Sequence, residues 1–132
     1  MLFRSYRDQG KWNEAEQLEV QVMDMSKKLL GPEHPDTLNS MGNLASTYRH
    51  QGKLNEAEQL QIQVMDMRKK LLGLEHPDTL TSIGSLASTY RDLGKLNEAE
   101  QLQIQVMDMS KKLLGPEHSV TLNSMENLLV AA

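Results

Sequence analysis

Histidine and glutamate are the residue types in this sequence that could perform acid–base chemistry or bind a metal ion, and both recur at a fixed spacing. Three of the four histidines, His34, His76 and His118, are separated by forty-two residues. The ligands of one metal ion must converge on a single point. Copies separated by a whole helix pair lie on the order of 10–20 Å apart, because packed helix axes are about 8–10 Å apart. We therefore predict no metal site, and we expect a structural role at helix starts for these histidines.

Paired charged residues follow the same spacing and could imitate a catalytic dyad. Two neighbouring carboxylates can act as general acid and base. Each glutamate pair, however, falls in the first turn of a predicted helix, and each lysine pair falls in the last turn, where the helix dipole accounts for both signs of charge. No phosphate-binding loop or nucleophile elbow occurs, so the sequence predicts neither an enzyme nor a cofactor. The pairs are Glu14/Glu16, Glu56/Glu58 and Glu98/Glu100, with Lys27/Lys28, Lys69/Lys70 and Lys111/Lys112.

These residues are positioned by a sequence repeat. Residues 31–72 and 73–114 differ at only seven of forty-two positions. A period of this length is typical of stacked repeats, in which each unit buries its apolar face against its neighbours. We expect one domain over residues 1–132, made of a partial repeat (1–30), two full repeats (31–72 and 73–114) and a terminal half repeat (115–132).

Each full repeat predicts two helices. Pro35 favours the start of the first helix, and Gly52 favours its end, because proline suits a first turn and glycine tolerates a left-handed residue. Asn55, followed by a glutamate three residues later, predicts a capping-box-like start for the second helix, and a start one or two positions earlier is the alternative. This helix is expected to end at Gly73. Because Gly10 occupies the same repeat position as Gly52, we expect a short helical stub before it. The whole chain then predicts seven helical segments.

Composition excludes several classes of partner. The net charge of -4 arises from interspersed signs, which leaves no broad basic surface for nucleic acid. No apolar run approaches the roughly 18 residues of a membrane span. The sequence contains no cysteine, which fits a reducing compartment. We therefore predict a cytoplasmic protein that binds neither nucleic acid nor membrane.

The repeat resembles a known family. The period alone would also suit HEAT or armadillo repeats. The residues Leu44-Ala45-x-x-Tyr48-x-x-x-Gly52-x-x-x-x-Ala57 instead resemble the tetratricopeptide signature. The connector from Gly31 to Asp36, which reads Gly-Pro-Glu-His-Pro-Asp, is similar to that of the kinesin light chain type. This resemblance implies an all-α fold, namely a right-handed superhelical solenoid of antiparallel helix pairs.

The resemblance also implies a concave groove lined by the first helix of each repeat, which receives peptides. Asparagine can bond to both groups of a peptide backbone, and arginine can hold carboxylates. Asn43 and Asn127 are the most specific candidates, because relatives use an asparagine at this place. An alternative is that the small residues at these positions only let the helices pack closely. The groove positions are Asn39, Gly42, Asn43, Ser46, Arg49 and His50, then Thr81, Gly84, Ser85, Ser88, Arg91 and Asp92, then Asn123, Glu126 and Asn127, with Arg4 and Arg7 near the N-terminus.

Two hypotheses about function follow. The first is a non-catalytic scaffold that binds a peptide or a segment of a partner protein in this groove. The second is a structural module that forms homo-oligomers by stacking head to tail. The second hypothesis arises because the first repeat lacks most of its first helix and the last repeat lacks its second, which leaves two complementary apolar faces.

Overall fold

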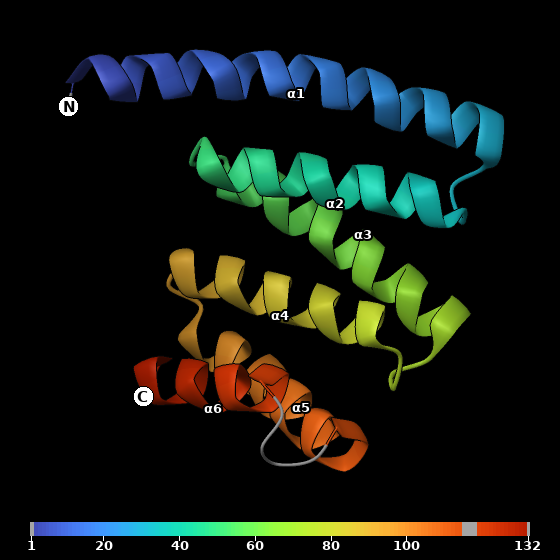
Figure 1. Cartoon of the computed structure of the whole chain (residues 1–132), viewed down its shortest axis with the longest axis vertical. Coiled ribbons are helices and arrows are strands. Elements are labelled where there is room, and N and C mark those ends of the chain that lie inside the picture. Colours follow the sequence, from blue (N-terminus) through green and yellow to red (C-terminus); the bar gives the residue numbers. More distant parts are fainter. Residues whose placement is uncertain (1, 115–118, 132) are drawn as a thin grey trace. The chain divides into compact units, whose positions relative to one another are not determined.

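The structure, a computed structural model, describes residues 2–114 and 119–131, with side chains described at 10–113 and 122–128. These residues form the helices α1 (Leu2–Leu30), α2 (Pro35–His50), α3 (Leu54–Leu72), α4 (Pro77–Asp92), α5 (Leu96–Leu114) and α6 (Ser119–Ala131), as Figure 1 shows. Within those residues there is no strand, and the predicted all-α class is confirmed. We call α2, α4 and α6 the A-type helices, because each opens a repeat, and α1, α3 and α5 the B-type helices.

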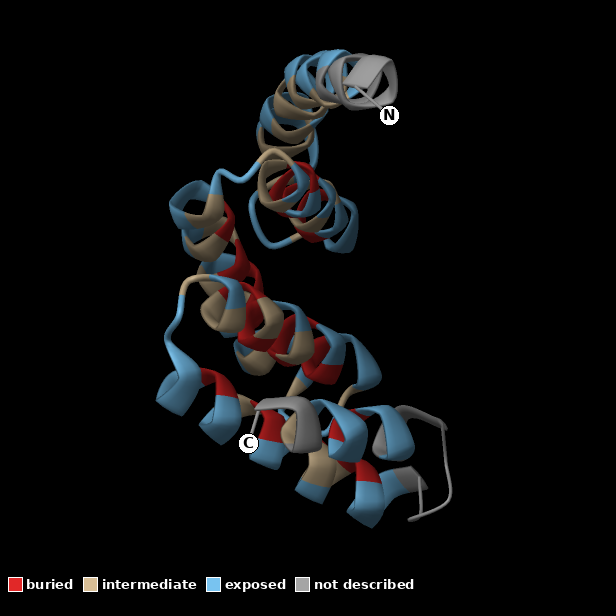
Figure 2. Cartoon of the chain, turned by 90° about the vertical axis from the view of Figure 1, so that its left-hand side faces the viewer, coloured by how far each residue is buried: buried red, intermediate tan, exposed pale blue. Residues whose placement is uncertain are grey.

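The chain divides into two compact units, Met1–Val64 and Met65–Ala132, with the boundary inside α3. In the first unit, α1 packs against α2. In the second unit, α5 packs against both α4 and α6. Figure 2 marks the buried residues as narrow strips along the helices. The prediction of one solenoid domain over residues 1–132 stays a prediction.

The helix starts follow the local sequence. His34 precedes α2 with extended backbone, and its Nδ1 accepts a hydrogen bond from the N–H of Asp36 at 3.1 Å. His76 accepts from the N–H of Asp78 at 3.0 Å in the same way. Each imidazole thus satisfies an N–H that the first turn of a helix leaves unpaired. The predicted helix-start role of these two histidines is confirmed, whereas His118 lies outside the described residues.

The predicted glycines end the A-type helices. Gly52 and Gly94 both have φ of +80°, a conformation that side chains with a Cβ disfavour. After α2, the N–H of Gly52 donates to the carbonyl of Arg49 at 3.0 Å, and the N–H of Lys53 donates to the carbonyl of Tyr48 at 2.8 Å. These paired bonds form a Schellman motif, which satisfies the last carbonyls of the helix.

Of the two predicted starts of the second helix, the earlier one is confirmed, and Asn55 does not cap the helix. Helix α3 begins at Leu54, so Asn55 already lies inside the first turn. The carbonyl of Lys53 accepts the first helical bond, from the N–H of Ala57 at 3.1 Å. Because the tight turn at Gly52 places Lys53 directly at the helix start, no residue is left between them to bring Asn55 into the capping position.

The prediction of seven helical segments is wrong, because α1 is one continuous helix of 29 residues through Gly10. Glycine inside a helix costs only about 1 kcal/mol relative to alanine, while each residue added to an existing helix gains a backbone hydrogen bond. Continuing the helix is therefore favoured over turning back.

The alanines of the repeat signature are fully buried. Ala45, Ala57, Ala87 and Ala99 have no exposed surface, so each lets the backbone of a neighbouring helix approach closely.

Across the described residues, no helix combines the length and the apolar character that a membrane span requires.

Candidate functional site

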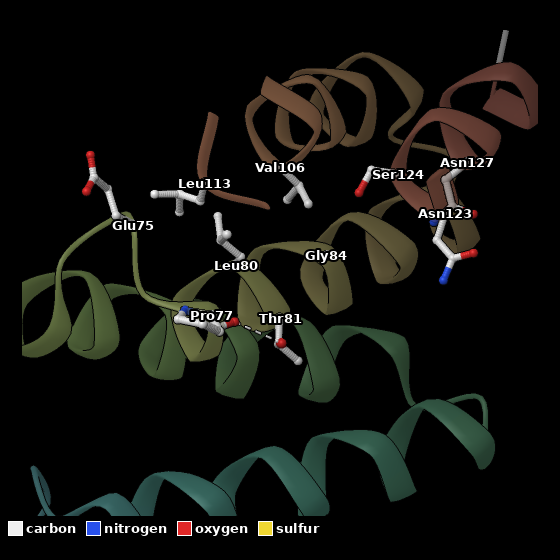
Figure 3. Close-up of a pocket in the computed structure, with 10 residues that line it drawn as sticks. All are labelled: Glu75, Pro77, Leu80, Thr81, Gly84, Val106, Leu113, Asn123, Ser124 and Asn127. Carbon is white, nitrogen blue, oxygen red and sulfur yellow. Dashed lines mark hydrogen bonds between the residues drawn. The ribbon is translucent and has the colours of Figure 1, made fainter. Parts of the chain in front are cut away.

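The second unit contains a hollow of about 440 Å³ between α4, α5 and α6. Figure 3 shows its side chains, with Val106 and Leu113 of α5 directed toward Leu80 of α4. These three residues form an apolar floor. Polar groups from the two A-type helices form the rim. The described residues that line it are Glu75, Pro77, Leu80, Thr81, Gly84, Val106, Leu113, Asn123, Ser124 and Asn127.

Repeat geometry places these residues together. Thr81 of α4 and Asn123 of α6 occupy the same position of successive repeats, so two parallel copies of one surface border the hollow. Val106 and Leu113 are seven residues apart, or about two helical turns, and so share a face of α5. Gly84 has no side chain, and a Cβ added there would meet no atom within 4 Å. The hollow therefore stays open along its α4 side.

The rim can hydrogen-bond with a ligand backbone. Asn123 and Asn127 are exposed and four residues apart, which places them on one face of α6. Each amide offers a carbonyl acceptor and two N–H donors. The hydroxyl of Thr81 donates to the carbonyl of Pro77 at 3.0 Å and retains lone pairs that can accept. An apolar floor below a row of amides can hold an apolar side chain and pair with the main chain that carries it.

Among the described residues that line the hollow, the one charged side chain is already paired. Glu75 lies at one end, and its Oε1 is 3.4 Å from the Nζ of Lys112. Both side chains are exposed, so water screens the pair, which contributes little to stability. The described part of the lining consequently offers no strong net charge to select an ionic ligand.

The hollow brings together four of the groove positions predicted on α4 and α6, namely Thr81, Gly84, Asn123 and Asn127. The other positions predicted on α4 do not line it. Ser85 and Asp92 are exposed and Arg91 is half-buried, while Ser88 donates its hydroxyl hydrogen bond to the carbonyl of Gly84 at 3.2 Å. On α6, Glu126 is exposed and lies outside the lining.

The positions predicted on α2 belong to the first unit. Asn39, Asn43 and Ser46 are exposed, and Arg49 is half-buried. His50 is turned toward α1, where its ring stacks on Trp12 with centroids 4.4 Å apart and planes inclined by 17°. The His50 Nδ1 also lies 2.8 Å from the carbonyl oxygen of Ser46. The side chains of Arg4 and Arg7 lie outside the described residues.

The residues around Trp12 join α1 to the end of α2. The side-chain amide of Gln51 donates to Asn13 at 2.8 Å, and Lys53 Nζ is 2.6 Å from Glu16 Oε1. This hydrogen bond to the carboxylate of Glu16 raises the pKa of Lys53 above its ordinary value. Burial, followed by the charge of Glu16, raises the pKa of Tyr48. Each of these contacts links the two helices, and none of them points to a ligand.

Sequence reasoning missed the floor of the hollow and the role of Trp12. Val106 and Leu113 follow a helical spacing, but that spacing is equally compatible with a filled core. A signal for Trp12 was present, because it replaces Leu54 and Leu96 at the same repeat position. Among the residues whose side chains are described, no three histidine, aspartate or glutamate side chains gather as they would around a metal ion.

The family assignment follows from comparison with known sequences. The family described as tetratricopeptide repeat matches residues 4–36, 37–78 and 79–119. These three matches cover most of the chain and reproduce its period. The chain belongs to the tetratricopeptide repeat family. Tetratricopeptide repeats are protein-interaction modules, typically non-catalytic scaffolds.

Solved structures place the chain among repeats of the kinesin light chain type. A putative kinesin light chain of Podosopora anserina, with nearly identical TPR-like repeats, is 38% identical with a TM-score of 0.87, over 98% of this chain and 62% of that one. Its Q17M form gives the same identity and TM-score, over 98% of this chain and 61% of that one. BtubC (BKLC) from P. vanneervenii is 19% identical with a TM-score of 0.80, over 95% of this chain and 49% of that one, and shows the fold alone. The chain spans less than two thirds of the length of these proteins, and no curated protein matches it.

Proposed function

We propose that this chain is a non-catalytic scaffold that binds an extended peptide segment of a partner protein along its A-type helices. The hollow between α4, α5 and α6 carries this proposal, because it joins an apolar floor to a rim of exposed amides. A large apolar side chain of the peptide enters the floor, and its burial contributes about 1.5–3 kcal/mol. The main chain beside that residue pairs with Asn123 and Asn127.

The other proposed contacts lie on the A-type helices of each unit. Ser85 and Asn127 occupy one repeat position in α4 and α6 of the second unit, and Asn43 occupies the same repeat position in α2 of the first unit. Such a surface selects mainly for extended conformation and for one apolar anchor. A cytoplasmic location forms part of the same proposal. The remaining proposed contacts are Asn39, Ser46, Arg49, His50, Ser88, Arg91 and Asp92.

The test is to select peptides from a random library on the purified chain and to titrate the selected peptide by calorimetry. Asn127→Ala should weaken binding roughly tenfold, because one or two hydrogen bonds of about 0.5–1.5 kcal/mol are lost. Gly84→Leu should abolish binding, because a side chain at this rim position fills the entrance to the hollow. Asn97→Ala is the matched control, since this exposed asparagine lies on α5 away from the hollow. Selected peptides whose affinity survives both groove substitutions would refute the proposal.

A second candidate function is self-assembly. One observation favours it: valine at one repeat position is buried in α3 and α5 but exposed in α1. Self-assembly and peptide binding use different surfaces, so the two functions are compatible. Sedimentation of the unmodified chain from micromolar to millimolar concentrations tests self-assembly, and a strict monomer throughout would exclude it.

A further inference from the structure

Helix α1 carries an exposed apolar strip, formed by Leu18, Val22, Met25 and Leu29. These residues are spaced by four, three and four positions, so they lie on one face of the helix. Isolated exposed apolar residues are ordinary, whereas a contiguous strip indicates an interaction surface. We call these four residues the α1 strip.

Comparison between repeats shows that the α1 strip lacks a packing partner that its equivalents have. Val22, Val64 and Val106 occupy the same repeat position, yet 53% of Val22 is exposed against 3% of Val64 and 6% of Val106. Helix α5 packs against the A-type helices on both sides, α4 before it and α6 after it, whereas α1 packs against α2, the one after it. Both α1 and α5 pack against the A-type helix that follows them. The greater exposure of Val22 therefore corresponds to the contact with a preceding A-type helix, which α5 makes and α1 does not.

Helix α6 shows the complementary difference. Met125 is 37% exposed, while Ile83, at the same position of α4, is fully buried. Leu122 is also exposed, while its equivalent Leu80 is buried. In the second unit, α4 packs against the B-type helix that follows it, α5. The exposed residues of α6 are therefore those that a following B-type helix would cover.

The two exposed faces have the residues of an interface that the chain already forms. The α1 strip is identical in sequence to Leu102, Val106, Met109 and Leu113 of α5. On α6, Leu122 and Leu128 match Leu80 and Leu86 of α4, and Met125 replaces Ile83. Within one chain, Leu80 of α4 and Val106 of α5 line the same hollow. If α6 of one molecule packs on α1 of another as α4 packs on α5, Leu122 of the first molecule takes the place of Leu80. Val22 of the second molecule then takes the place of Val106.

We propose that the α1 strip binds α6 of a second copy of this chain, in the register in which α4 packs on α5. This inference rests on self-assembly, the second candidate function, and names its two surfaces. Leu122 of one copy lies against Val22 and Leu29 of the next. Because the two surfaces differ, the contact is head to tail and leads to a ring or a filament.

The experiment uses two variants that each block one surface. Val22→Glu places a negative charge in the α1 strip, and Leu122→Glu places a negative charge on α6, so the two altered surfaces also repel each other. Both sites are exposed in the single chain, so each variant should keep its helical circular dichroism spectrum. Each variant alone should self-associate roughly a hundredfold more weakly than the unmodified chain, because a charge would be buried without a partner. Gln21→Glu adds the same charge at the neighbouring exposed residue outside the strip, and it should assemble as the unmodified chain does.

Mixing the two variants distinguishes the possible contacts. The Val22→Glu chain retains an intact α6, and the Leu122→Glu chain retains an intact α1 strip. The mixture should therefore form a one-to-one dimer that does not grow, because its two remaining surfaces each carry a glutamate. Suppose instead that the unmodified chain assembles and the Leu122→Glu chain still dimerises by itself. That result would overturn the inference, because α1 would then pair with α1, while self-assembly would stand. An unmodified chain that stays monomeric would overturn both and would leave peptide binding untouched.

Discussion

Three glycines at one repeat position should respond to the same substitution with opposite signs. Gly10, Gly52 and Gly94 are equivalent in sequence. Gly52 and Gly94 have φ of +80° at the ends of α2 and α4, whereas Gly10 lies inside α1 with no positive φ. We predict that Gly10→Ala stabilises the protein, and that Gly52→Ala and Gly94→Ala destabilise it.

The magnitudes follow from backbone conformation, because a Cβ at any of the three positions would meet no atom within 4 Å. Alanine in the left-handed region costs about 1–2 kcal/mol. Alanine in place of glycine inside a helix gains about 1 kcal/mol. The Gly10→Ala and Gly52→Ala variants should therefore differ by about 2–3 kcal/mol. At about 4 °C per kcal/mol for a chain of this size, their Tm values should differ by roughly 8–12 °C.

The assay is urea unfolding followed by circular dichroism, with the fluorescence of Trp12 as a second signal from α1. Trp12 is the only tryptophan, and it lies two residues after Gly10. Gly94→Ala serves as an independent repeat of Gly52→Ala in the other compact unit. If Gly10→Ala destabilised the protein as much as Gly52→Ala does, Gly10 would end a helix, and the continuous α1 would be refuted.

Two further predictions concern single contacts. His76→Ala should cost about 1 kcal/mol of unfolding free energy because it removes the acceptor for the N–H of Asp78, and His76→Asn should restore most of it; equal urea midpoints for His76→Ala and the unmodified chain would contradict this role. Val64→Ala should cost about 2 kcal/mol, since two buried carbons and their packing are lost, whereas Val22→Ala should cost less than about 0.5 kcal/mol at a concentration where the chain is monomeric. Equal losses for the two valines would show that their burial does not differ.

The contact between α1 and α2 contains residues that differ between the repeats. Trp12 replaces the leucine of the later repeats, and His50 and Gln51 stand where the next repeat has Asp92 and Leu93. Trp12 and His50 stack, and Gln51 bonds to the neighbouring Asn13. Residues that depart from the repeat thus meet in space. Their effect is to secure the first A-type helix against the one B-type helix that shares its unit in full.

The sequence alone determined the helices from α2 to α6, their main boundaries and the family. Pro35, His34 and Gly52 act within one helical turn, so their effect depends on residues only a few positions away. The three- and four-residue spacing of apolar side chains acts over the same range. Such signals can be read from the printed sequence, and for that reason the capping roles of His34 and His76 and the helix ends at Gly52 and Gly94 were predicted correctly.

Tertiary structure decided the features that depend on neighbours distant in the chain. Gly10 and Gly52 have the same repeat position, yet Gly10 lies inside α1 and Gly52 ends α2 with φ of +80°. Val22 and Val64 are the same residue at the same position, yet their exposure differs because a packing partner is present in one case and absent in the other. The hollow beside Asn127 likewise exists because α4, α5 and α6 leave a space that no short stretch of sequence encodes.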